Sequence, residues 1–191
     1  MGNKLADLQD KLDQWQTANS SYLQEIKTAV TRLKTPQYFQ IISYFTYSLN
    51  VSHDSDLDSI CLGNFYIENL GNQPLEKPYI CLKISEGAPF EFSGRYVYET
   101  SKLKRKTPDA WERINDQTNK EEYWLRPLGK QTLLPGDKLH FSNFQLKWLA
   151  KGSYSGSLMG FIYGDQVKEG RSALNQINIS GTAKERGEEH E

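Results

Sequence analysis

The 191-residue sequence predicts a mainly β fold, an antiparallel β-sandwich, preceded by one long N-terminal α-helix. Apolar residues over positions 5–33 recur at alternating spacings of three and four, which is typical of a helix. After Pro36, apolar and polar residues alternate in short runs separated by turn residues, which is typical of strands. No helical pattern interrupts these runs, so the predicted sheets are antiparallel.

The predicted helix covers residues 1–35, and its apolar seam has the spacing of a coiled coil. Pro36 ends the helix, because the residue before a proline is disfavoured in the α conformation. A helix of about 31 residues is about 46 Å long. Because an isolated helix is marginally stable in water, something must cover the seam. The seam positions are Leu5, Leu8, Leu12, Trp15, Asn19, Tyr22, Ile26, Ala29 and Leu33.

Two partners could cover this seam: a second copy of the helix, or the β-domain of the same chain. Asn19 favours self-pairing, because a buried Asn at this heptad position fixes the register of a two-stranded parallel coil. Trp15 and Tyr22 are bulky for a tight dimer, while Leu23 and Val30 widen the apolar stripe and suit more strands or packing onto the β-domain. We predict a homo-oligomer, a dimer or trimer, held by this arm, and the second alternative stays open.

The β-domain is predicted to span residues 36–182, with about eight strands. The apolar phase shifts after Phe141, which predicts a bulge near Ser142 and Asn143. Residues 183–191 are charged and lack large apolar side chains, so a disordered tail is expected there. The predicted strands are residues 38–51, 59–69, 79–85, 90–98, 123–128, 139–148, 158–163 and 173–180.

Residues 100–122 are predicted to form a long inserted loop, and loops of this length are often functional. A cluster of basic residues next to a tryptophan makes it a candidate partner-binding loop for a phosphate-bearing molecule. The alternative is an ordinary solvated loop. The candidate residues are Lys102, Lys104, Arg105, Lys106 and Trp111.

The charge balance and the cysteines limit the classes of partner and the compartment. The chain has 23 basic and 24 acidic residues, a balance that disfavours nucleic acid as a partner. It has neither a signal peptide pattern at its start nor an apolar run long enough for a membrane span. Strand alternation points Cys61 inward and Cys81 outward, which disfavours a disulfide between them. Free thiols fit a reducing compartment, and we expect a cytoplasmic location.

Three short segments have a recognisable pattern. One predicted strand ends in Asn69-Leu70-Gly71, the strand Ile80-Cys81-Leu82-Lys83-Ile84 follows, and a later strand comes after the corner Pro135-Gly136-Asp137. These segments resemble immunoglobulin-like bacterial modules of the cell-adhesion-related (CARDB) type, in which one strand ends in Asn-x-Gly and a later strand follows a Pro-Gly-acidic corner. The resemblance implies an immunoglobulin-like sandwich and supplies no catalytic residues.

Motifs for catalysis or metal binding are weak. Asp54, Asp56 and Asp58 resemble the start of a calcium loop, but Ser59 stands where the loop needs Gly. Residues 152–156 are predicted to form a turn, and they place Tyr rather than Ser at the centre of a Gly-flanked pentapeptide, so no nucleophile elbow is expected. We therefore predict no catalytic, cofactor-binding or metal-binding residues.

These observations predict a non-enzymatic interaction or structural protein, in which the coiled coil multimerises a β-sandwich binding head for an unknown protein or glycan partner. One alternative is a carbohydrate-binding or phage-structural module of the same architecture. Another is a hydrolase with two acidic residues in a sandwich cleft, since a glycosidase requires only two carboxylates.

Overall fold

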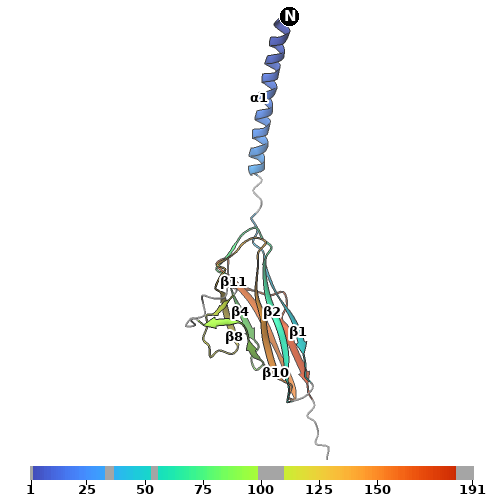
Figure 1. Cartoon of the computed structure of the whole chain (residues 1–191), viewed down its shortest axis with the longest axis vertical. Helices are drawn as coiled ribbons and strands as arrows, with labels where there is room; N and C mark the ends of the chain where they lie inside the picture. The colour runs from blue at the N-terminus through green and yellow to red at the C-terminus, as the bar shows by residue number, and fades with distance from the viewer. Residues whose placement is uncertain (1, 33–36, 53–55, 99–109, 184–191) are drawn as a thin grey trace, which may run out of the picture. The chain divides into compact units, whose positions relative to one another are not determined.

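The computed structural model describes residues 2–32, 37–52, 56–98 and 110–183. The chain divides into two compact units, residues 1–37 and 38–191. Strands dominate the second unit, and one helix, α1 (Gly2–Arg32), forms the first (Figure 1). The predicted mainly β fold with an N-terminal helix is therefore confirmed.

Helix α1 is 31 residues long. The hydroxyl of Thr17 donates to the carbonyl of Asp13, and Thr28 donates in the same way to Gln24, both at 2.8 Å. Among the described helices, none has the apolar length that a membrane span requires. The predicted helix end at Thr35 lies outside the described residues.

Two sheets make up most of the second unit, and Figure 1 labels β1, β2 and β10 of the first and β4, β8 and β11 of the second. The first sheet contains, in spatial order, β1 (Ile41–Asn50), β2 (Asp58–Asn69), β10 (Lys138–Leu149) and β5 (Glu91–Ser93). The second contains β12 (Val167–Ser172), β11 (Ser153–Gly164), β4 (Tyr79–Ile84), β8 (Glu122–Pro127), β7 (Trp111–Arg113) and β6 (Tyr96–Tyr98), and β13 (Ile177–Thr182) also pairs with β11. Separately, β3 (Leu75–Glu76) pairs with β9 (Thr132–Leu133). Pairing is antiparallel except between β6 and β7, which are parallel.

The inner faces of the two sheets share one apolar core. Strand alternation buries Phe45 and Phe65 from the first sheet and Ile162 from the second. Gly160 of β11 lies directly against the Phe65 ring, and a Cβ there would also be 2.8 Å from the Phe45 ring. The absence of a side chain at Gly160 therefore lets the two layers pack closely at this point.

A β-bulge interrupts β10, as the phase shift in the sequence predicts. The register between β10 and β2 shifts between Phe141 and Phe144. Asn143 has a φ of 58°, a left-handed conformation that Asn tolerates better than most residues. Its N–H donates to the side chain of Asn64 at 3.0 Å, so a cross-strand bond stabilises the bulge.

The two turn motifs of the sequence meet at Asn69, which is buried. The Asn69 amide donates to the carbonyls of Gln73 and Leu133, and its oxygen accepts the N–H of Gly71 at 3.0 Å. The N–H of Gly136 donates to the Asn69 carbonyl at 2.9 Å. The Asn-x-Gly and Pro-Gly-acidic segments thus form one hydrogen-bonded corner, although they are distant in sequence.

Several strand assignments need correction, and strands β3, β9 and β12 were not predicted. The predicted loop 100–122 contains β7, which pairs with β8 inside the second sheet; residues 99–109 lie outside the described part of the chain. The predicted strand 90–98 is divided at Gly94 into β5 and β6, which belong to different sheets. The predicted turn 152–156 is the start of β11. These segments are short, and long-range pairing rather than local alternation determines their structure.

Candidate functional site

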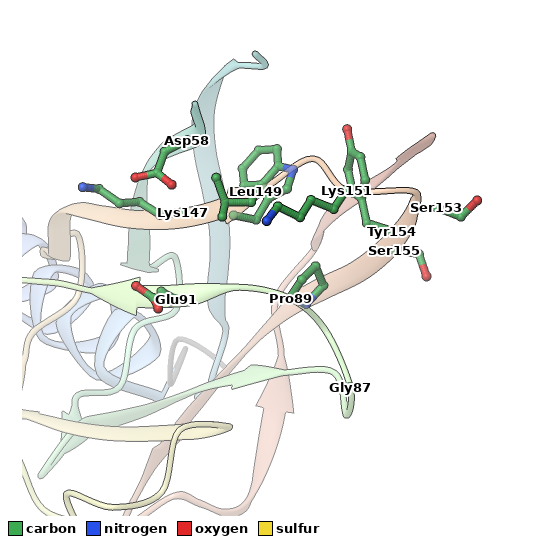
Figure 2. Close-up of a pocket in the computed structure, with 11 residues that line it drawn as sticks. Asp58, Gly87, Pro89, Glu91, Lys147, Leu149, Lys151, Ser153, Tyr154 and Ser155 are labelled. Carbon is green, nitrogen blue, oxygen red and sulfur yellow. The ribbon is translucent and has the colours of Figure 1, made fainter. Parts of the chain in front are cut away.

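A pocket of about 570 Å³ lies between the end of β10 in one sheet and the start of β11 in the other. Figure 2 shows Asp58, Glu91 and Lys147 on one side of it and Tyr154 with two serines on the other. Strands β2, β5, β10 and β11 all contribute, so long-range pairing assembles the pocket. Its lining residues are Asp58, Gly87, Pro89, Glu91, Lys147, Trp148, Leu149, Lys151, Ser153, Tyr154 and Ser155.

The charges that line this pocket balance. Two carboxylates, Asp58 and Glu91, stand against two ammonium groups, Lys147 and Lys151. Lys147 lies directly opposite Glu91 in the β10–β5 pair, a favourable arrangement of opposite charges across strands. A pocket with balanced charges and several hydroxyl groups suits a neutral ligand rich in hydrogen-bonding groups better than a strongly charged one.

Two aromatic residues, Trp148 and Tyr154, line the pocket, and Phe90 packs against Trp148. Trp148 is buried, its ring centroid lies 5.6 Å from that of Phe90 in an edge-to-face contact, and Tyr154 lies 6.2 Å away. A Cβ at Gly156 would be 2.5 Å from the Phe90 ring, so glycine is needed at that position. The Trp148 indole N–H has no hydrogen-bond partner among the described residues, a desolvation cost of about 1–3 kcal/mol.

Of the predicted partner-binding residues, Trp111 lies in the described part of the chain. Trp111 is only 3% exposed, its indole N–H donates to the His140 carbonyl at 3.0 Å, and its ring packs edge-to-face on Phe141. Trp111 therefore belongs to the core and is not available to a partner. A single Trp among polar residues has no periodic pattern from which its burial could be predicted. Lys102, Lys104, Arg105 and Lys106 lie outside the described residues.

Sequence reasoning missed a polar network around Arg113, which is buried at the end of β7. Its guanidinium donates to the side chain of Asn115 and to the carbonyl of Asp116, each at 3.0 Å, and to the carbonyl of Asn119. The same group lies 4.4 Å from the centre of the Tyr123 ring. These bonds fold the connection between β7 and β8, so we assign Arg113 a structural role.

A comparison with models of protein families finds no match. A comparison with curated proteins also finds none. The function must therefore be inferred from the chemistry of the chain itself.

Both cysteines are free and buried. Cys61 points into the core, as predicted, and burial raises its pKa to about 11. Cys81 lies on the outer face of the second sheet, with Trp124 and Phe161 as its cross-strand neighbours. Burial raises the pKa of Cys81 to about 12, so it is a weak nucleophile despite its outward direction.

An aromatic cluster on this outer face includes Tyr79, Trp124 and Tyr163. The Tyr79 and Tyr163 rings stack at 5.1 Å, and Trp124 lies 5.0 Å from Tyr163. Glu122 accepts the Trp124 indole N–H at 2.9 Å and pairs with Lys83 at 2.8 Å. The rings contact one another, so the cluster forms a small satellite core on the sheet.

Among the described residues, the metal-ligand types and His140 do not gather into a site. No group of three His, Cys, Asp or Glu side chains is placed to hold a metal ion in that part of the chain. His140 is exposed, and its ring lies 6.0 Å from that of Tyr66. Of the proposed calcium loop, Asp54 lies outside the described residues and Asp58 begins β2.

The helix seam is described at six of its predicted positions: Leu12, Trp15, Asn19, Tyr22, Ile26 and Ala29. All six side chains are exposed on the single chain. The structure does not describe the side chains of the other three seam residues, Leu5, Leu8 and Leu33.

Proposed function

We propose that this chain is a non-enzymatic interaction or structural protein, in which an N-terminal coiled coil multimerises an immunoglobulin-like β-sandwich binding head. The supporting observation is the exposure of the large seam residues of α1. Leu12, Trp15, Tyr22 and Ile26 are each 58–77% exposed. A helix of this length gains most of its stability from packing, so these residues require a covering surface.

The energetics favour burial of the seam between copies. Burying one large apolar side chain contributes about 1.5–3 kcal/mol relative to leaving it in water. Leu23 and Val30 are also more than half exposed beside the seam. Their position widens the apolar stripe and suits a trimer, whereas Asn19 favours a dimer.

The head is proposed to be immunoglobulin-like and related to the cell-adhesion-related modules. Two packed sheets, antiparallel except for the β6–β7 pair, support this, as does the hydrogen-bonded corner of Asn69 and Gly136. Copies held together would bind a repeated protein or glycan partner with an avidity about 10²–10⁴-fold above that of one head. We place this assembly in the cytoplasm.

Light scattering of the full chain tests the assembly. The variant with Leu12→Lys and Ile26→Lys places two charges in the seam and should reduce the mass measured in dilute solution to that of a monomer. The matched control, Gln14→Lys with Gln24→Lys, adds the same charge away from the seam and should keep the oligomer. A monomeric unmodified chain, or equal masses for both variants, would refute the coiled coil.

A second candidate function is carbohydrate binding at the pocket between β10 and β11. Its balanced charges, its serine hydroxyls and the Tyr154 ring suit a neutral sugar. Binding to a glycan array should be lost in Asp58→Asn and Glu91→Gln. The control Glu169→Gln changes an exposed acid on β12 and should bind normally. Equal binding by all three variants would place any glycan site elsewhere.

The hydrolase alternative uses the same two acids. Asp58 and Glu91 are the two carboxylates among the residues that line this pocket, which is the minimum that glycoside hydrolysis requires. A screen with chromogenic glycosides would support it if turnover disappears in Glu91→Gln and persists in Glu169→Gln. Absence of turnover in the unmodified chain leaves the binding role as the better account.

A further inference from the structure

Strand β1 is the end strand of the four-stranded sheet, so one of its edges has no neighbouring strand. Along its first half, a later segment of the chain covers this edge. The N–H of Leu174 donates to the Ser43 carbonyl at 2.8 Å. The Asn175 side chain accepts the Phe45 N–H at 2.7 Å and donates to the Phe45 carbonyl at 3.0 Å. The outward carbonyl of Ser43 and both outward backbone groups of Phe45 are thus partnered.

The second half of the same edge is open. All residues from Thr46 to Asn50 are exposed. Because the backbone groups of Phe45 point outward, those of Tyr47 and Leu49 do so as well. Within the described residues, no hydrogen bond reaches the outward N–H and C=O groups of these two residues. Their side chains are also 43% and 46% exposed.

This edge lacks the features that prevent strands from pairing between molecules. Exposed edges are usually protected by charged residues, proline or a bulge. The segment Ile41–Asn50 contains neither a charged residue nor a proline. Its pairing with β2 is regular over all ten residues, without a bulge. The open half is therefore a straight and uncharged template for another strand.

We propose that the open half of β1 pairs antiparallel with the same segment of a second copy, about a two-fold axis at Ser48. Ser48 is the midpoint of the exposed stretch. This register therefore pairs the unbonded backbone groups of Tyr47 and Leu49 with the same groups of the second copy, and it leaves Asn175 bonded to Phe45. Tyr47 of each copy then lies opposite Leu49 of the other, and these two residue pairs together exchange about four hydrogen bonds.

A second copy fits this edge better than other segments of the chain. The segments outside the described part that are long enough to form a strand, residues 99–109 and 184–191, are both rich in charged residues. An uncharged edge has no groups to pair with those charges, so binding would leave them desolvated. An identical edge is neutral, and its Tyr and Leu side chains can bury one another.

The paired edges would join two four-stranded sheets into one continuous sheet. The contact is short, so a weak and concentration-dependent dimer is expected. This contact is separate from the proposed helical coil, because it uses only residues of the β-domain. It is therefore tested in the full chain with Leu12→Lys and Ile26→Lys, where the helix seam cannot pair.

Register-specific disulfide formation is the main experiment. Ser48 of each copy forms a non-hydrogen-bonded pair, whose Cβ atoms are about 4.5–5.5 Å apart. That spacing is close to the one a disulfide requires. Ser48→Cys should give a covalent dimer under mild oxidation, and Asn50→Cys, which lies opposite Thr46, should stay largely monomeric. A mixture of Thr46→Cys and Asn50→Cys should give a heterodimer.

Equal cross-linking of Ser48→Cys and Asn50→Cys, or none in either, would overturn this register. The pairing itself is tested without a disulfide by sedimentation at increasing concentration. Leu49→Lys should abolish the concentration-dependent mass increase. Ile114→Lys, which changes an exposed apolar residue just after β7 in the other sheet, should retain it. If the chain with Leu12→Lys and Ile26→Lys alone keeps a monomer mass at every concentration, the proposal is overturned altogether.

Discussion

The side-chain amide of Asn175 bonds to both backbone groups of Phe45, accepting its N–H at 2.7 Å and donating to its carbonyl at 3.0 Å. One side chain thereby provides the two hydrogen bonds that a neighbouring strand would supply. The same bonds fix the connection between β12 and β13 against β1. Asn175 therefore marks the boundary between the covered and the open parts of this edge.

Replacing Asn175 with Ala should lower the free energy of unfolding by about 1–3 kcal/mol, because the partly buried backbone groups of Phe45 lose their partners. Urea unfolding followed by fluorescence measures the change. Asn178→Ala, at an exposed position of β13, is the control and should change stability by less than about 0.5 kcal/mol. Equal effects of both variants would show that the bonds to Phe45 contribute little.

Gly160→Ala should destabilise the β-domain by about 1–3 kcal/mol through overpacking. The added Cβ would meet the Phe65 ring and lie 2.8 Å from the Phe45 ring. Thermal unfolding measures the loss. Ser155→Ala, on the exposed face of the same strand, should leave the melting temperature nearly unchanged. An unchanged melting temperature for Gly160→Ala would mean that the two sheets are farther apart than described.

Glu122 should make the stability of the domain depend on acid pH. Hydrogen bonds from Lys83 and then from Trp124 hold the pKa of Glu122 below its ordinary 4.5. A lowered pKa in the folded state means that the stabilisation is present above 4.5 and is lost as the pH falls through the folded value. Because Lys83 and Glu122 are partly exposed, the effect is on the order of 0.5 kcal/mol.

The measurement is the urea midpoint between pH 3 and pH 6. In Glu122→Gln the midpoint should fall less steeply with acid, because this group no longer titrates. Glu169→Gln is the control and should retain the slope of the parent chain. A parallel slope in Glu122→Gln would exclude this carboxylate as a source of the pH dependence.

Both thiols should resist modification in the folded protein. Burial raises the pKa of Cys61 to about 11 and that of Cys81 to about 12, so neither forms much thiolate near pH 8. Reaction with Ellman's reagent should be slow in buffer and should reach two thiols per chain in denaturant. Rapid reaction of one thiol in buffer would show that the aromatic cluster around Cys81 opens.

Asn19→Leu should raise the melting temperature of the assembled chain and broaden its distribution of oligomer numbers. A buried Asn reduces the stability of a coiled coil while fixing its register and number of strands. Differential scanning calorimetry and light scattering measure the two effects. A lower melting temperature would place Asn19 outside a buried seam.

Local patterns in the sequence were sufficient for several elements. The spacing of Leu12, Trp15 and Ile26 predicts a helix, because a period near 3.6 follows from helical geometry alone. Two-residue alternation predicts the long strands β1, β2 and β10, because successive side chains of a strand point to opposite faces of the sheet. The phase shift before Phe144 even predicts the bulge.

Tertiary structure alone decided the burial of Trp111 and Cys81, the division of residues 91–98 between two sheets, and the assembly of the pocket from β2, β5, β10 and β11. It also placed Asn175 beside Phe45, 130 positions away in sequence. Each of these features depends on which strands become neighbours. Strand pairing is a long-range choice determined by the packing of the whole core, and a local period contains no information about it.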